Sequence, residues 1–206
     1  MAKSKLIPLD KLSLQDLDAM NKEELPTTLP ILPLRNTVLF PGVVIPITAG
    51  RDKSIKLINE TNKNGKVIGV VSQKDESKEN PGPKDINSIG TVAQILRVLK
   101  MPDGNTTVII QGKKRFEVAE VMTTDPYMTA TIREVAEARP AKENAEFQEI
   151  ISSIKELSLT IIKDSPNIPS EAAFAIKNIE SSSFLINFVS SNLNISVEEK
   201  QKLLEI

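Results

Sequence analysis

The sequence contains no histidine, no cysteine and no tryptophan. Without histidine and cysteine, the chain cannot build a Ser–His or Cys–His nucleophile, carry out thiol redox chemistry, form a disulfide, or bind zinc through nitrogen or sulfur. An enzyme made from this sequence would therefore depend on carboxylates, lysines, hydroxyl groups, or a hard metal ion held by oxygen ligands.

Glycine is also scarce, with 8 residues in the chain. The two Gly-Lys pairs, at Gly65 and Gly112, have neither the earlier glycine nor the following Ser or Thr of a phosphate-binding loop. No G-x-G-x-x-G and no G-x-S-x-G motif occurs. The sequence therefore offers none of the common glycine-dependent sites for nucleotides or for an acyl-transfer nucleophile.

The paired carboxylates do not predict a catalytic or metal site. Glu23-Glu24, Asp75-Glu76 and Glu198-Glu199 lack the apolar surroundings that would raise a carboxyl pKa for acid catalysis. Asp75 and Glu76 taken with Asp85 lack the ligand spacing of a calcium loop. Spacing alone leaves a Ser–Lys dyad open, although solvated side chains explain the many Ser and Lys residues better. We expect no catalytic residue, no cofactor site and no metal site in this chain.

Neither sign of charge dominates, since 26 Lys and Arg face 27 Asp and Glu for a net charge of −1. Such a balance argues against a dedicated nucleic-acid-binding protein. The densest basic run, Lys113, Lys114 and Arg115, is the one candidate for contacting DNA or RNA phosphates. A solvated hairpin end is the favoured alternative, because Glu117 and Glu120 dilute the charge and aromatic residues make up only 3% of the chain.

Long apolar runs are missing as well. No stretch approaches the roughly 18 residues of a membrane-spanning helix, and the start of the chain does not read as a signal peptide. At 206 residues, with 40% hydrophobic and 26% charged residues, the composition is that of a globular protein. We therefore expect a cytoplasmic protein with no membrane partner.

The pattern along the chain predicts an α+β fold in three parts. Residues 1–28 form a lead-in that is partly disordered or holds one short helix between Leu12 and Met20, with Ser13 as its N-cap. Residues 29–140 are rich in strands, with one helix over 51–64. Strands are expected over 29–34, 43–47, 66–72, 89–101, 106–112, 115–124 and 128–138. Pro30, Pro33 and Pro46 predict edge or bulged strands, which could also accept an extended peptide by strand addition.

Residues 141–206 have helical periodicity. A first helix is expected over 141–163, and Ser170, Ser181 and Ser196 mark the starts of three more. Glu199 stands three residues after Ser196, which is the spacing of a capping box. The last helix has no stop signal, so we expect it to continue in a longer chain.

Two apolar bends are candidates for contacting other polypeptides. The first is Phe40-Pro41-Gly42-Val43 and the second is Leu99-Lys100-Met101-Pro102. The contact candidates in them are Phe40, Pro41, Val43, Met101 and Pro102. Large apolar side chains at bends either pack into the core, which is the commoner outcome, or form an exposed patch that binds apolar segments of other chains. Methionine suits such a patch because its flexible side chain adapts to varied partners. A turn is expected at Pro102–Asn105.

Five segments occur in the order and spacing of one known family. They read LPILPLRNTVLFPGVVIPI, GRDKSIKLI, QKD, GTVAQILRVLKMPDG and QGKKRF. From about Leu29 to the end, the chain resembles the N-terminal domain of the Lon ATP-dependent protease family. The resemblance implies a β-rich PUA-like pseudo-barrel with one packed helix, followed by a C-terminal helical bundle.

The same resemblance implies a role in selecting substrates and assembling a hexamer. In that family an AAA+ motor, which uses ATP and Mg, and a Ser–Lys peptidase domain follow in the same chain. Neither lies in this sequence, so the leading hypothesis is a non-catalytic module that recognises unfolded or damaged polypeptides. Three alternatives stay open: an oligomerisation and spacer module, a free-standing Lon-domain protein, and a nucleic-acid-binding module.

Overall fold

The computed structural model describes residues 24–102, 104–137, 144–164 and 171–206. The short helix expected between Leu12 and Met20 and the domain junction expected near Pro140 lie outside these residues. The division of the chain into a strand-rich part and a helical part at that junction therefore stays a prediction.

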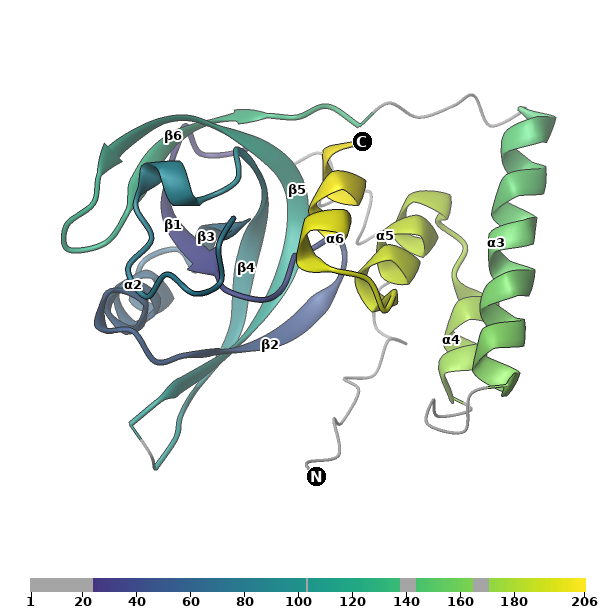
Figure 1. Cartoon of the computed structure of the whole chain (residues 1–206), viewed down its shortest axis with the longest axis horizontal. Coiled ribbons are helices and arrows are strands. Elements are labelled where there is room, and N and C mark those ends of the chain that lie inside the picture. The colour runs from purple at the N-terminus through teal and green to yellow at the C-terminus, as the bar shows by residue number, and fades with distance from the viewer. Residues whose placement is uncertain (1–23, 103, 138–143, 165–170) are drawn as a thin grey trace.

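Strands dominate the first half of the described chain and helices the second (Figure 1). The expected mixed α+β class is confirmed. The elements are β1 (Thr28–Leu34), β2 (Val44–Ala49), α2 (Asp52–Lys63), β3 (Val67–Ser72), the short 3-10 turn η2 (Pro83–Asp85), β4 (Ile89–Lys100), β5 (Thr106–Thr123), β6 (Thr129–Glu134), α3 (Ala145–Asp164), α4 (Glu171–Asn178), α5 (Ser182–Asn192) and α6 (Val197–Glu205).

The strands form one sheet in the order β2-β5-β4-β3-β1-β6, and a further pairing between β5 and β6 closes it into a barrel. All pairs are antiparallel except β1 with β3. The separate strands expected over 106–112 and 115–124 are wrong, because β5 runs unbroken for 18 residues. Gly112 does not start a turn: it lies buried where the Phe40 carbonyl approaches the strand too closely for any Cβ.

The prolines have different consequences in the first two strands. β2 pairs only with β5, so the edge strand expected from Pro46 is confirmed. β1 has two neighbours, so an edge position is wrong for it. However, β6 pairs with Thr28–Pro30 and β3 with Ile31–Leu34, so each half of β1 has one partner. The N–H missing from each proline therefore need not break the sheet.

The barrel is filled by two clusters of apolar side chains, and α2 closes one of them. Leu57 and Ile58 on α2 are fully buried against barrel residues such as Ile68 and Ile110. The helix ends as expected at Asn64, and Gly65 follows with a positive φ of 82°.

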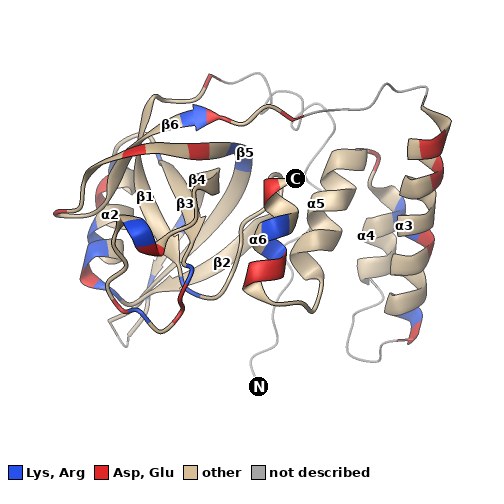
Figure 2. Ribbon diagram, turned by 45° about the horizontal axis from the view of Figure 1, so that its top comes forward, with Lys and Arg blue, Asp and Glu red and all other residues tan. Residues whose placement is uncertain are grey.

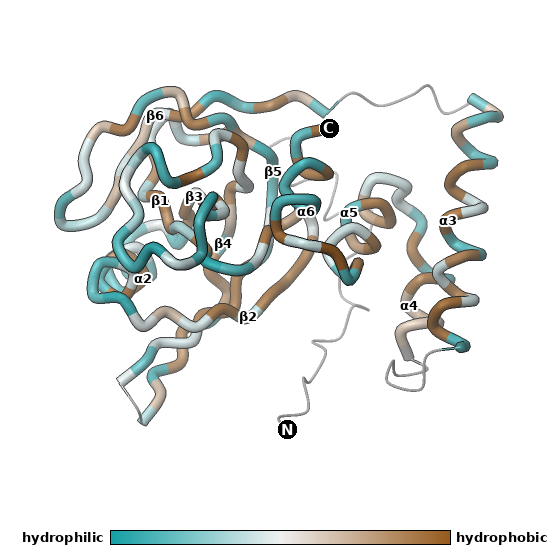
Figure 3. Tube along the Cα trace, in the orientation of Figure 1, coloured by the Kyte–Doolittle hydropathy of each residue, from teal (hydrophilic) through white to brown (hydrophobic). Residues whose placement is uncertain are grey.

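The four C-terminal helices lie in a row that leads away from the barrel, with α6 beside it and α3 farthest from it (Figure 1). They share a third apolar cluster with the chain before β2, in which Phe40 and Val43 pack with Ile151, Phe184 and Leu204. Apolar residues recur along α3, α4 and α5 (brown in Figure 3), and α5 has no charged residue (tan in Figure 2).

Serine caps fix the starts of the last two helices, as the sequence predicts. The Ser181 hydroxyl accepts a hydrogen bond from the Phe184 N–H at 3.2 Å, and the Ser196 hydroxyl accepts one from the Glu199 N–H at 3.2 Å. The Glu199 carboxylate in turn accepts from the Ser196 N–H at 2.9 Å, which completes the expected capping box.

Candidate functional site

The two candidate bends lie in opposite environments. Phe40 and Val43 are only 1% and 6% exposed, because the C-terminal helices cover them. The expectation that they contribute to an exposed patch is therefore wrong for the folded chain. Pro41 is half-buried. Gly42, which has a positive φ of 79°, lets the chain turn so that Phe40 and Val43 both enter the core.

The second bend is exposed. It forms the end of the β4–β5 hairpin, which projects beyond the barrel at the lower left of Figure 1. The expected turn is confirmed by two backbone hydrogen bonds: the Met101 N–H donates to the Asn105 carbonyl at 2.9 Å, and the Gly104 N–H donates to the Met101 carbonyl at 3.1 Å. Met101 is 44% exposed and Pro102 is exposed as well.

Two leucines on β4 extend this exposed surface. Leu99 is 40% exposed and Leu96 is 47% exposed. Leu96 lies at an irregularity of register between Ile95 and Arg97, where β4 has one residue more than β5. Val98 faces inward onto the core that contains Val108, so Leu99 must face outward. We call Leu96, Leu99, Met101 and Pro102 the hairpin patch.

The free edge of β2 is a poor acceptor for an added strand. The Gly112 N–H donates to the Val43 carbonyl at 2.9 Å, and the register then pairs Ile45 with Ile110 and Pro46 with Ile109. Because donors alternate along an antiparallel strand, the nitrogen of Pro46 faces the free edge. That nitrogen has no hydrogen to donate, so the middle of the edge is blocked. The exposed side chains of the hairpin patch are therefore the better candidate for peptide contact.

The basic run Lys113–Arg115 is engaged within the protein. The Lys114 ammonium forms an ion pair with Glu134 at 2.9 Å. The Arg115 guanidinium donates to the backbone carbonyl of Leu204 near the end of α6 at 2.9 Å. Lys113 is half-buried. Lys114 and Arg115 thus hold parts of the chain together, which weakens the nucleic-acid interpretation.

Arg115 belongs to a set of polar contacts that dock α6 on the barrel, and sequence reasoning missed this role. Gln201 on α6 is buried, with the Ser72 hydroxyl donating to it at 2.6 Å and its own amide donating to the Ile89 carbonyl at 3.1 Å. A glutamine in an exposed-looking helix pattern gives no sign that its partners lie more than a hundred residues earlier in the sequence.

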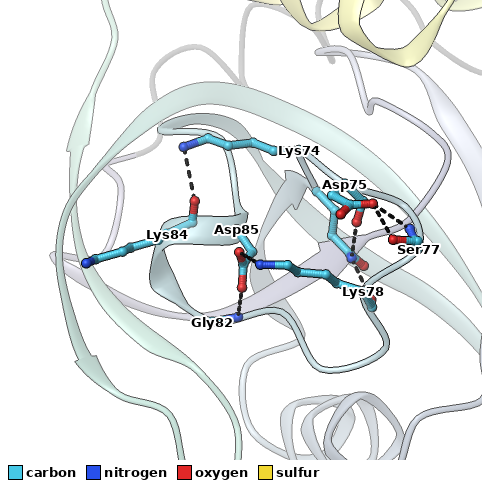
Figure 4. Close-up of polar contacts among 8 residues, drawn as sticks. Lys74, Asp75, Ser77, Lys78, Gly82, Lys84 and Asp85 are labelled. Atoms are coloured by element: carbon cyan, nitrogen blue, oxygen red, sulfur yellow. Dashed lines mark hydrogen bonds and ion pairs between the residues drawn. The ribbon is translucent and has the colours of Figure 1, made fainter.

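Among the described residues, Asp75 and Asp85 make local contacts within one loop. Asp75 accepts hydrogen bonds from Ser77, and Asp85 accepts from Lys78 and from the Gly82 N–H (Figure 4). These contacts lower the pKa of both aspartates, with Ser77 the main cause for Asp75 and Lys78 the main cause for Asp85. Within the four described ranges, no group of three or more acidic side chains is placed to hold a metal ion.

Residues 28–206 match the family described as the ATP-dependent protease La (LON) substrate-binding domain. The chain belongs to this family. It is similar to the Lon protease of Flavobacterium johnsoniae, at 64% identity over 221 residues that cover 100% of this chain and 27% of the relative. It is also similar to the Lon protease of Cytophaga hutchinsonii, at 50% identity over 90% of this chain and 23% of the relative. The LON substrate-binding domain described here thus spans only a part of these relatives.

Two solved structures share the fold of this LON domain. The N-terminal domain of the Mycobacterium avium complex Lon protease matches with a TM-score of 0.71 at 20% identity, over 87% of this chain and 90% of that chain. A Lon N-terminal domain protein from Xanthomonas campestris matches with a TM-score of 0.62 at 16% identity, over 88% and 91%. These likenesses support the mixed α+β fold as a whole.

A second apolar surface of the LON domain lies on the helices. Ile150, Leu157 and Ile161 are exposed and follow the i, i+7, i+11 spacing of one face of α3. The neighbouring α4 exposes Phe174, which is 69% exposed. We call these four residues the α3–α4 patch. None of the helices that the structure describes is both long enough and apolar enough to cross a membrane.

Proposed function

We propose that this chain is the part of an ATP-dependent protease that captures unfolded or damaged polypeptides, and that the hairpin patch makes the contact. The observation that carries this proposal is the exposure of Met101 at the hairpin end and of Leu96 and Leu99 on the strand that leads to it. A polypeptide that exposes apolar residues would bind there, whereas a folded protein with a polar surface would not.

One such patch binds weakly. Its three large side chains are 40–47% exposed. Contact with a peptide therefore gains only part of the roughly 1.5–3 kcal/mol available for fully burying each one. Ordering a flexible peptide offsets much of that gain. Several patches presented together, as in a hexamer, would raise the effective concentration of substrate and make capture efficient.

The chemical steps would belong to other parts of a longer protein. The relative from Flavobacterium johnsoniae is named a protease, and this chain covers 27% of it. In our proposal, ATP and Mg are used and peptide bonds are cut in domains outside this sequence, to which the captured polypeptide is passed. Two findings favour a part of a longer protease over a free-standing protein. The matching family is described as a substrate-binding domain, and the chain covers only 27% and 23% of these two relatives. The PUA-like architecture and the helical bundle are part of the same proposal, and the closed sheet supports the first of them.

A binding experiment with the 206-residue chain tests the role of the hairpin patch. We expect Leu99→Glu/Met101→Glu to weaken binding of a permanently unfolded, fluorescein-labelled model protein about tenfold, because charge replaces apolar contact. Met122→Glu is the control, since Met122 is also an exposed methionine, at 57%, but lies near the far end of β5, away from the hairpin turn. Equal binding by all three proteins, with unchanged circular dichroism, would remove the hairpin patch from the proposal.

The exposed α3–α4 patch favours a second candidate function, in which the helical region mainly mediates contacts between subunits. Apolar surface on a helix row is typical of such contacts. Sedimentation of the chain and of Leu157→Glu/Phe174→Glu distinguishes the two. Self-association that only the substituted chain loses would support this function for the helices, and a monomer at all concentrations would count against it.

A further inference from the structure

A cleft of about 270 Å³ lies on the barrel, and the hairpin patch takes no part in lining it. Its walls come from β1, the first turn of α2, the Asn80–Pro83 loop and the turn before β6. The exposed part of its apolar surface comes from Tyr127, Pro81 and Pro83, and the nearly fully buried Ile31, Leu57 and Met128 lie beneath them. The volume is slightly below the roughly 300–1,000 Å³ of drug-sized ligand sites, so the cleft has room for one or two side chains rather than a cofactor.

The loop wall of the cleft is held in place by polar contacts within residues 73–85 (Figure 4). Lys78 pairs with Asp85, and the Asp85 carboxylate accepts the Gly82 N–H at 2.9 Å, directly beside the prolines that line the cleft. The buried Gln73 donates to the Lys78 carbonyl at 3.0 Å. The wall therefore has a fixed shape before any ligand arrives, which reduces the ordering cost of binding.

The opposite wall is also fixed. The Tyr127 hydroxyl donates to the Glu60 carboxylate on α2 at 2.9 Å. This bond raises the pKa of Tyr127, so the phenol stays protonated and the ring stays in position against α2. Glu60 itself does not line the cleft.

The charge of the cleft is one-sided. Arg51 and Lys53 line it, and no Asp or Glu does so among the described residues. The Arg51 guanidinium donates a hydrogen bond to the Gln73 side chain at 2.5 Å. Burial and the charge of Arg35 lower the pKa of Arg51, and the charge of Glu79 raises it.

Lys53 makes a long ion pair, which is exposed to solvent. It donates to the Thr124 carbonyl at 2.8 Å, and its nearest carboxylate, the exposed Asp125, is 3.8 Å away. Two cations beside an apolar floor are complementary to an apolar group with a neighbouring carboxylate.

We propose that this cleft is a second contact point for substrate, which takes one large apolar side chain of an unfolded polypeptide while a neighbouring Asp or Glu of that polypeptide pairs with Arg51 and Lys53. The inference rests on the proposed function and adds a second contact to the one at the hairpin patch, beside which Arg97 and Lys100 are also exposed. We choose an internal Asp or Glu rather than the C-terminal carboxylate as the partner, because an unfolded chain presents many acidic side chains but only one C-terminus.

Short fluorescein-labelled peptides with blocked ends test the preference on the 206-residue chain. We expect a peptide centred on Glu-Phe-Glu to bind about fivefold more tightly at low salt than one centred on Lys-Phe-Lys or on Glu-Ala-Glu. The preference for the acidic peptide should shrink as salt rises. Arg51→Gln/Lys53→Gln should abolish it, whereas Lys63→Gln, at the exposed end of α2, should not.

Lys53→Gln alone covers the case in which the double variant disturbs the loop, because it leaves the bond between Arg51 and Gln73 intact. It should weaken the acidic peptide about twofold. Amide chemical shifts place the peptide: signals of Asn80, Gly82 and Thr124 should move. Equal binding of the acidic and basic peptides, or shifts confined to Leu99 and Met101, would overturn the cleft inference while leaving the hairpin proposal standing. Failure of unfolded protein to bind the chain at all would remove both.

Discussion

The Phe40–Val43 bend and the Leu99–Pro102 bend are both apolar but lie in opposite environments. Each combines large apolar side chains with a proline at a turn. The first is enclosed between the barrel and the helical row, and the second projects into solvent. What separates them is the partner: residues more than a hundred positions later cover the first bend, and nothing in the described chain covers the second. Apolar composition alone therefore does not identify a binding surface.

Phe40→Ala should cause the largest loss of stability at either bend. Phe40 is one of the largest fully buried side chains and joins the barrel to the helices, so its truncation leaves a cavity at that junction. We expect a loss of about 3–5 kcal/mol in the free energy of unfolding. Urea denaturation followed by circular dichroism measures it. A loss below about 1 kcal/mol would mean that the helices do not enclose this bend in solution.

Gly112→Ala perturbs the buried bend from β5, the strand that faces the Phe40 carbonyl. An added Cβ would overlap the Phe40 carbonyl. The backbone cannot move away easily, because the Gly42 N–H donates to the Gly112 carbonyl and the Gly112 N–H donates to the Val43 carbonyl, both at 2.9 Å. We expect about 1–3 kcal/mol of destabilisation from overpacking. Gly104→Ala, at the tip of the hairpin, is an informative companion: its Cβ meets nothing, so any cost arises from its positive φ alone.

Arg115→Gln tests whether the basic run is structural. Loss of the bond to the Leu204 carbonyl should destabilise the chain by about 1–2 kcal/mol, because a charge-assisted hydrogen bond to α6 is removed. Binding to DNA at low salt should be no weaker for the variant than for the parent chain. A stable variant that loses salt-sensitive DNA binding would restore the nucleic-acid interpretation.

The smallest effect on stability should come from the exposed bend. Leu99→Ser and Met101→Ser should change the free energy of unfolding by no more than about 0.5 kcal/mol, because both side chains are already substantially solvated. Thermal melts of these variants beside Phe40→Ala measure the contrast directly. Comparable losses at both bends would show that the hairpin packs against something in solution.

Sequence patterns predicted local structure well where local chemistry decides it. Ser181 and Ser196 cap their helices, Asn64 ends α2, and the Pro102–Asn105 turn joins β4 to β5, because each signal acts within a few residues. Sequence patterns failed where contacts with residues far away in the sequence determine the local structure. The continuity of β5 through Gly112 depends on the Phe40 carbonyl, and the two neighbours of β1 depend on closure of the sheet.

The candidate site shows the same division. Met101 and Pro102 are exposed, as one of the two interpretations of an apolar bend predicts, because no described segment covers the turn. Phe40 and Val43 were misplaced because their cover comes from α3, α5 and α6. Leu96 was missed because it reads as an ordinary strand residue, and only the register irregularity between Ile95 and Arg97 shows that β4 has an extra residue there.

Methyl NMR of the 206-residue chain, titrated with a permanently unfolded polypeptide, tests the central claim most directly. The account predicts that the methyl signals of Leu96, Leu99 and Met101 shift or broaden first, while those of Val43 and Leu204 stay unchanged. Shifts at Val43 and Leu204 with a silent hairpin would show that substrate opens the junction between barrel and helices instead, and would contradict the account.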